Sequence, residues 1–187
     1  MRRTFLLAAG AAFCSMAVVF ILKTLADTMF LAEYGSAYVP HFFAAQSLTL
    51  AVTAAGYSRM IKTGPLLHLD LTIVVLLAAT AMLAPLAIDL GGPAVFAVAL
   101  LLVALSELAF MAVWNAATAV ARGRAQRSFL PRASAAATAG AIFGGFAASA
   151  ISATVGVTWL GLAATLFLIA IAVAAALARG RNDRWAR

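Results

Sequence analysis

The chain has 187 residues, of which 65% are hydrophobic and 10% are charged, and its formal net charge at pH 7 is +7. This composition excludes an ordinary water-soluble domain and indicates an integral membrane protein. The basic residues stand between apolar stretches rather than in one cluster, so the positive charge does not predict a nucleic-acid-binding protein, and a single cysteine excludes an internal disulfide.

Six apolar stretches are long enough to cross a bilayer, because about 20 helical residues cover a hydrocarbon core of roughly 30 Å. In chain order they are predicted at about residues 4–30, 40–61, 66–88, 93–121, 131–151 and 157–178, followed by a basic tail at 179–187. They leave no room for a soluble domain. The predicted fold is therefore all-α, a polytopic membrane protein whose single transmembrane domain spans residues 1–187.

Prolines mark most of the predicted helix starts. A proline in the first turn of a helix costs no hydrogen bond. The four prolines at such positions are Pro40, Pro65, Pro93 and Pro131. Pro85 instead lies inside the third stretch, where it is predicted to kink the helix and to free the carbonyl of Ala81.

Twelve of the thirteen basic residues fall at alternate junctions between the predicted spans. They are Arg2, Arg3, Arg59, Lys62, Arg122, Arg124, Arg127, Arg132, Arg179, Arg181, Arg184 and Arg187. By the positive-inside rule these junctions are cytoplasmic, which predicts a multi-pass protein of a bacterial-type inner (plasma) membrane with both termini in the cytoplasm. Short outer loops at 35–39, 89–92 and 152–156, and a longer inner loop at 122–132, predict that successive helices are antiparallel neighbours.

Two opposite charges stand inside the first predicted span. Lys23 and Asp27 are four residues apart, which places them on one helical face within reach of each other. An ion in the bilayer interior costs at least about 2.5 kcal/mol on insertion scales, so such residues face partners or a water-filled cavity. Two interpretations stay open: a substrate site in which Lys23 attracts an anion, or a self-neutralising structural ion pair.

Three further polar residues complete the candidate substrate-binding set. Glu107 near the middle of the fourth span either pairs with Lys23 across the bundle or is protonated and hydrogen-bonded, with a proton relay as a further alternative. Gln46 lies on a mildly polar stripe of the second helix, and Asn115 lies on the cytoplasmic half of the fourth. The sequence contains no metal-ligand cluster, phosphate-binding glycine loop or catalytic triad, so we expect no metal, no cofactor and no enzymatic activity.

Small residues recur at about four-residue spacing along the fifth predicted span. They let helix backbones approach closely, and helix association in lipid depends on such packing. The predicted helix-packing interface consists of Ala137, Gly140, Ala141, Gly144, Gly145 and Ala148. Either another helix of the same chain or a second chain is expected to cover it.

Two regions carry a family resemblance. The segment from Leu22 to Leu31 contains Lys23 and Asp27 and is followed by Val39-Pro40. The second region runs from Phe110 through Trp114-Asn115 and Arg127-Ser128-Phe129-Leu130-Pro131 to the glycine-rich stretch from Gly140 to Gly145. In this order they resemble the first helix, the basic loop and the fifth helix of the nucleotide-transporter (ATP/ADP-translocase) branch of the major facilitator superfamily.

The resemblance implies a six-helix half of a transporter whose two halves bind substrate between them near the midplane, with Lys23 contacting the anion and the fifth helix contacting the other half. The prediction is a half-size, facilitator-like transport protein for a small organic anion or nucleotide, acting as a homo-oligomer or with a second membrane subunit. The alternative is a non-transporting membrane subunit of a larger complex, in which Lys23, Asp27 and Glu107 form a buried structural network.

Overall fold

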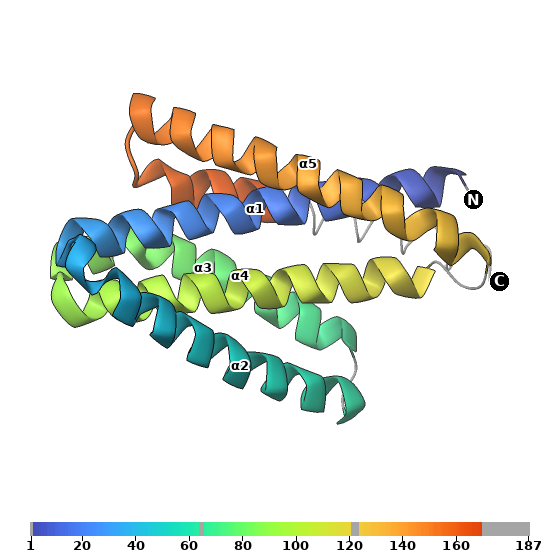
Figure 1. Cartoon of the computed structure of the whole chain (residues 1–187), viewed down its shortest axis with the longest axis horizontal. Coiled ribbons are helices and arrows are strands. Elements are labelled where there is room, and N and C mark those ends of the chain that lie inside the picture. Colours follow the sequence, from blue (N-terminus) through green and yellow to red (C-terminus); the bar gives the residue numbers. More distant parts are fainter. Residues whose placement is uncertain (1, 64–65, 121–123, 170–187) are drawn as a thin grey trace.

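A computed structural model of the chain describes residues 2–63, 66–120 and 124–169 (Figure 1). Its elements are α1 (Arg2–Tyr34), the 3₁₀ helix η1 (Ser36–Tyr38), α2 (Val39–Thr63), α3 (Leu66–Leu90), α4 (Gly92–Val120), α5 (Arg124–Thr154) and a shorter apolar helix, Trp159–Ile169. The described residues contain no β-strand, so the all-α prediction is confirmed. The predicted sixth span beyond residue 169 and the basic tail lie outside the described residues.

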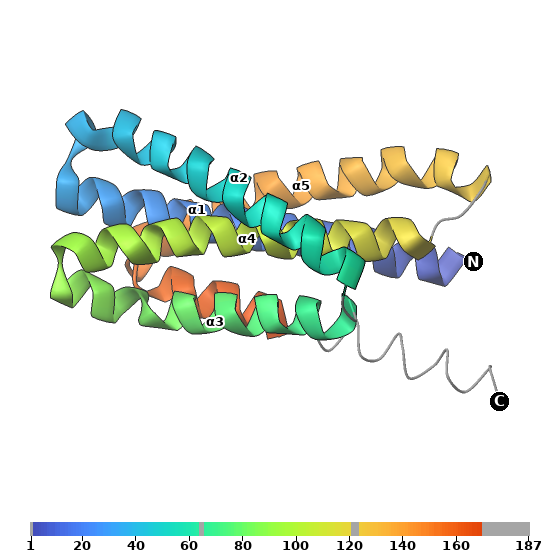
Figure 2. The same cartoon turned by 90° about the horizontal axis from the view of Figure 1, so that it is seen from below.

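The helices form three layers (Figures 1 and 2). α1 and α4 lie side by side in the middle, α2 and α5 stand on one side of them, and α3 and the Trp159–Ile169 helix lie on the other. The connections that follow α1, α3 and α5 meet at one end of the bundle, opposite the N-terminus (Figure 1). We call it the Gly35 end.

Four helices contain a segment that is long and apolar enough to cross a membrane, which supports a membrane protein with transmembrane helices. The segments are Ala9–Tyr34, Thr72–Leu90, Gly92–Asn115 and Leu130–Thr154. α2 is as long as α3, but its polar residues keep it out of this set, and the Trp159–Ile169 helix is apolar but short. Of the six predicted crossings, four therefore meet this criterion in the described part of the chain.

The predicted start of the fifth helix is wrong. α5 begins at Arg124 and carries Pro131 inside it, so most of the predicted 122–132 loop is helix. The prediction rests on Pro131 as a first-turn proline and on the basic residues before it, although Arg, Ala, Gln and Leu all favour helix. Pro40 and Pro93 stand in the first turns of α2 and α4, as predicted, and Pro65 lies outside the described residues.

Glycines in the left-handed backbone region make the three connections at the Gly35 end. The φ angles are +75° at Gly35, +66° at Gly91 and +100° at Gly156, a region that favours glycine. Glu33 joins two of these connections, because its Oε1 accepts a hydrogen bond of 2.6 Å from the N–H of Gly92 at the start of α4. A carboxylate at this position also interacts favourably with the positive end of the α4 dipole.

α1 is the central helix and packs against both α5 and α4. A Cβ added at Gly144 would lie 2.5 Å from the carbonyl oxygen of Ala17, and one added at Gly140 would collide with the carbonyl of Phe13. The buried face of α5 consists of Ala133, Ala137, Gly140, Gly144 and Ala148. Much of the small-residue face is thus covered by α1 of the same chain, while Ala141 and Gly145 lie half-buried at its margin.

The other contacts do not follow chain order. α4 packs against α3 and also contacts α2. α1 does not pack along α2, nor α2 along α3, nor α4 along α5, so among the described helices α1–α5 the expectation of successive antiparallel neighbours holds for α3 and α4 alone. Pro85 lies inside α3, as predicted, and removes the N–H that would bond the carbonyl of Ala81. That carbonyl lies against Gly161, whose missing side chain leaves room for it.

The α1–α5 contact predicts a difference between two adjacent glycines. Gly144→Ala should lower the melting temperature of the purified protein, because the new methyl group overpacks the backbone of Ala17, at a cost of about 1–3 kcal/mol. Gly145→Ala is the matched control, since nothing lies within 4 Å of its added Cβ, and it should leave the melting temperature unchanged or raise it. Equal losses for both variants would contradict the observed packing.

Candidate functional site

The charged residues of α1 lie on its less covered face. Leu22 and Leu25 are fully buried, whereas Lys23 and Asp27 are half-buried and Phe20 is 38% exposed. Positions 20, 23 and 27 share one face of a helix with 3.6 residues per turn. The charges therefore lie where the neighbouring helices do not fully cover α1.

Lys23 and Glu107 both occupy the middle third of their apolar segments. Lys23 is the fifteenth of the 26 residues of Ala9–Tyr34, and Glu107 is the sixteenth of the 24 residues of Gly92–Asn115. In a segment that spans a bilayer, a charge at this position needs a partner inside the protein or in an enclosed space.

Gln46 of α2 approaches Asp27 of α1. The carboxylate of Asp27 interacts with the Gln46 side chain and with the charge of Lys23 one turn earlier in α1. Gln46 is only 8% exposed, and its Nε2 and the buried Oδ1 of Asp27 make no hydrogen bond of standard geometry among the described residues, although the two side chains approach each other. Buried polar atoms normally make such a bond, and leaving one unpaired costs about 1–3 kcal/mol. We call Lys23, Asp27 and Gln46 the polar cluster.

The hydroxyl groups near the polar cluster are already used by the backbone. Thr24 Oγ1 donates to the carbonyl of Phe20 at 2.8 Å, and Thr28 Oγ1 donates to the carbonyl of Thr24 at 2.7 Å. On α2, Ser47, Thr49 and Thr53 make similar bonds within the helix. These groups satisfy themselves locally, so the groups available to a ligand are those of the polar cluster.

Aromatic rings close the polar cluster toward the Gly35 end. Phe30 of α1 stacks on Phe42 of α2, with ring centroids 4.1 Å apart and an interplanar angle of 12°. Tyr34 stacks on Phe30 at 5.0 Å, and Phe96 of α4 meets Phe42 edge-on at 6.0 Å. Phe30 lies three residues after Asp27 and Phe42 four residues before Gln46, so the rings lie one helical turn nearer the Gly35 end.

Sequence reasoning missed this ring cluster. The sequence does contain a signal for it. Phe30 and Phe42 stand on either side of the short connection between α1 and α2, and each lies one helical turn from a polar residue, Asp27 or Gln46. A short connection between two helices brings such positions together.

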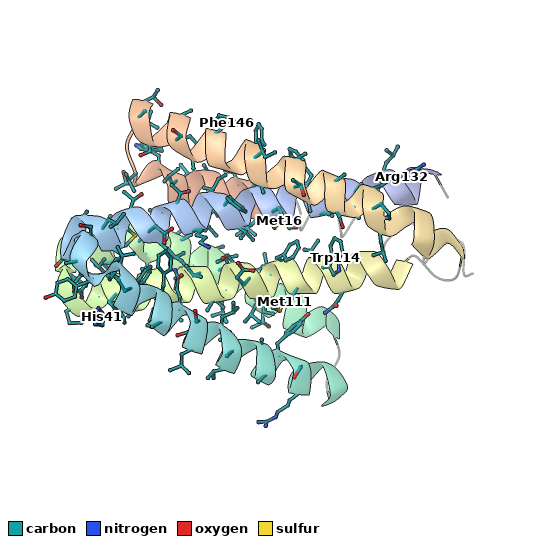
Figure 3. All side chains as sticks on the ribbon, viewed as in Figure 1. Met16, His41, Met111, Trp114, Arg132 and Phe146 are labelled. Carbon is teal, nitrogen blue, oxygen red and sulfur yellow. The ribbon has the colours of Figure 1, made fainter. Side chains whose placement is uncertain are left out.

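Glu107 and Asn115 both lie on α4. Among the described side chains, no ion pair or hydrogen bond joins Glu107 to Lys23. Asn115 is exposed and lies eight residues beyond Glu107, about 12 Å further along α4. Figure 3 shows the neighbouring Met111 and Trp114 on this part of α4. Of the five predicted substrate-binding residues, the structure thus brings together Lys23, Asp27 and Gln46.

A small cavity lies inside the bundle, away from the polar cluster. Its volume is about 10 Å³, and it lies between α1, α3, α4 and the Trp159–Ile169 helix, with Ser15, Ser106 and apolar side chains around it. Both hydroxyls donate to backbone carbonyls, and this volume is at the lower limit for one water molecule. In the described ranges no group of three or more His, Cys, Asp or Glu side chains could hold a metal ion.

No family model, curated protein or solved structure matches this chain. The polar cluster is accordingly interpreted from its own geometry.

The unpaired amide of Gln46 predicts an unusual stability effect. Gln46→Met should leave the melting temperature unchanged or raise it, because the substitution removes a buried N–H group without a partner, worth about 1–3 kcal/mol. Thr80→Val is the matched control. Thr80 has the same 8% exposure, but its hydroxyl has a partner, because it donates to the carbonyl of Leu76. A clear loss of stability in Gln46→Met alone would show that its amide has a structural partner.

Proposed function

We propose that this chain is a membrane transport protein that works with a second six-helix unit, either another copy of itself or a separate subunit, and moves a small organic solute with an anionic group. The polar cluster carries this proposal. It places an ammonium and a carboxylate on the central helix α1 beside an amide on α2, and two of its buried atoms have no standard hydrogen bond among the described residues. A bound solute would supply those partners.

The layer arrangement supports a site between two units. α2 and α5 stand on the same side of the middle layer and flank α1 and α4 (Figure 2). A second unit facing that side would enclose the polar cluster. Rocking of the two units would then open the enclosed space to one side of the membrane at a time.

The described arrangement corresponds to a state that is closed at the Gly35 end. The rings of Phe30 and Phe42 block that end, and Glu33 ties the α1 connection to the start of α4. Toward the other end α2 diverges from α1 (Figure 1). Solute would therefore exchange with the side that holds the N-terminus.

The charge distribution supports an orientation for this unit. The basic residues place the N-terminus and the C-terminus in the cytoplasm and the Gly35 end outside, with six crossings of a bacterial-type inner membrane. The resemblance to the nucleotide branch of the major facilitator superfamily favours the same scheme.

The second candidate function is a non-transporting subunit of a larger membrane complex. The observation that favours it is the dry interior, since the cavity near Ser15 and Ser106 is barely large enough for one water. Large apolar residues on α5, including Phe146, which is 74% exposed, would then face another protein or lipid. In this case the polar cluster has a structural role.

The proposed orientation predicts the accessibility of two serines. In a variant with Cys14 replaced by alanine, Ser36→Cys should react with a membrane-impermeant maleimide in intact cells. Ser58→Cys should react only after permeabilisation, because Ser58 lies at the basic end of α2. Both side chains are exposed, so a failure to react reflects the side of the membrane rather than burial. The reverse pattern would contradict the proposed topology.

The transport proposal predicts saturable uptake by the purified native oligomer in liposomes, tested with labelled carboxylates, amino acids and nucleotides. Lys23→Ala should reduce uptake at least about tenfold, equivalent to about 1.4 kcal/mol of lost binding free energy, whereas Lys23→Arg should retain much of it. Arg132→Ala removes the same charge from an exposed position on α5 and should leave uptake nearly unchanged. Absence of saturable uptake for every solute class in a verified native oligomer would remove the transport proposal.

A further inference from the structure

The charges in the membrane interior do not favour a polyanion. Away from the ends of the four apolar segments, the described charged residues are Lys23, Asp27 and Glu107, one positive and two negative. A nucleotide carries several negative charges, so it would meet more like charge than opposite charge there. Such repulsion is poorly screened where water is scarce.

The unpaired atoms of the polar cluster include both a donor and an acceptor. Among the described residues, Oδ1 of Asp27 is a buried acceptor and Nε2 of Gln46 a buried donor, and neither makes a hydrogen bond of standard geometry although their side chains approach each other. The Lys23 ammonium adds a charged donor one turn away. A simple anion could pair with Lys23 and Gln46. The Asp27 oxygen would then stay unpaired, and its negative charge would repel the anion.

A ligand with both charges satisfies all three residues. Its carboxylate would accept hydrogen bonds from Lys23 and Gln46, and its ammonium would donate to Oδ1 of Asp27. Side chains four residues apart in a helix have Cβ atoms about 5–6 Å apart, and the lysine stem is longer than that of aspartate. The two charged groups of α1 can therefore meet opposite ends of a small ligand whose own charges are separated by one carbon.

We propose that the polar cluster binds a small zwitterion of the amino-acid type, with a carboxylate recognised by Lys23 and Gln46 and an ammonium recognised by Asp27. This inference rests on the proposed function, because it names the substrate class of the same site. The proposed substrate is thus a monocarboxylate that also carries a positive charge, rather than the nucleotide that the family resemblance implies. The stacked rings of Phe30 and Phe42 close the site on the side of the Gly35 end.

The test uses ligands of matched skeleton and the purified full chain in lipid nanodiscs. Binding of alanine and leucine is compared by calorimetry with that of propionate and isocaproate, which lack the ammonium, and of ethylamine and isoamylamine, which lack the carboxylate. ATP serves as the polyanion. At least one amino acid should bind about tenfold or more tightly than both of its analogues and than ATP, since each analogue leaves a charged group of the site unpaired.

Two aspartate variants assign the ammonium contact. Asp27→Asn should abolish the preference of the site for the amino acid over its carboxylate analogue, because the amide no longer attracts an ammonium. Asp89→Asn removes a carboxylate from an exposed position at the end of α3 and should keep that preference. Since the readout is a ratio of two affinities, a moderate loss of stability in Asp27→Asn does not affect it.

The outcomes separate this inference from the proposed function. If ATP or the carboxylate analogues bind as tightly as the amino acids, or are the solutes taken up by liposomes, the zwitterion assignment is wrong and the transport proposal stands. If Asp27→Asn keeps the full preference for amino acids, Asp27 does not recognise the ammonium and the assignment is also wrong. If no solute of any class is bound or taken up, both fail.

Discussion

The close approach of α1 and α5 at Gly140 and Gly144 is the contact on which the rest of the bundle depends. Carbonyl groups of Phe13 and Ala17 occupy the space that larger residues on α5 would need. Lipid tails are as apolar as leucine, so helices in a bilayer associate through such packing rather than through the hydrophobic effect. This contact, with α4 also packed against α1, holds α1 in the middle layer.

The position of α1 explains why its charges stay within the bundle. A central helix cannot move Lys23 and Asp27 to the membrane surface without losing its contacts with α4 and α5. The short connection at Gly35 returns α2 beside the same part of α1, which brings Gln46 to Asp27 and stacks Phe42 on Phe30. A buried polar atom without a partner lowers the stability of the fold. Such atoms are typical of functional positions, where a sequence departs from what folding alone would favour.

The tertiary structure also changes the interpretation of Lys23. In the sequence, its resemblance to an anion-contacting lysine of nucleotide transporters draws attention to a single positive charge. In the bundle, the carboxylate of Asp27 lies close enough to interact with that charge, and Glu107 occupies a similar depth on α4. In the proposed site, the balance of one cation against two carboxylates therefore favours a zwitterion over a polyanion, which the lysine alone would not indicate.

For the residues that the structure describes, the sequence by itself determined the α-helices and most of their ends, because apolar length, first-turn prolines and connecting glycines act locally. It also singled out Lys23, Asp27 and Gln46, since polar groups are conspicuous in an apolar stretch. It did not determine the start of α5 at Arg124, where a basic segment with good helix formers supports either state. Only the tertiary structure decided that α1 packs between α4 and α5, that Gln46 meets Asp27 and that Phe30 stacks on Phe42. The physical reason is that most helix faces in this chain are similarly apolar, so the choice of which faces meet depends on close backbone contacts between residues far apart in the sequence.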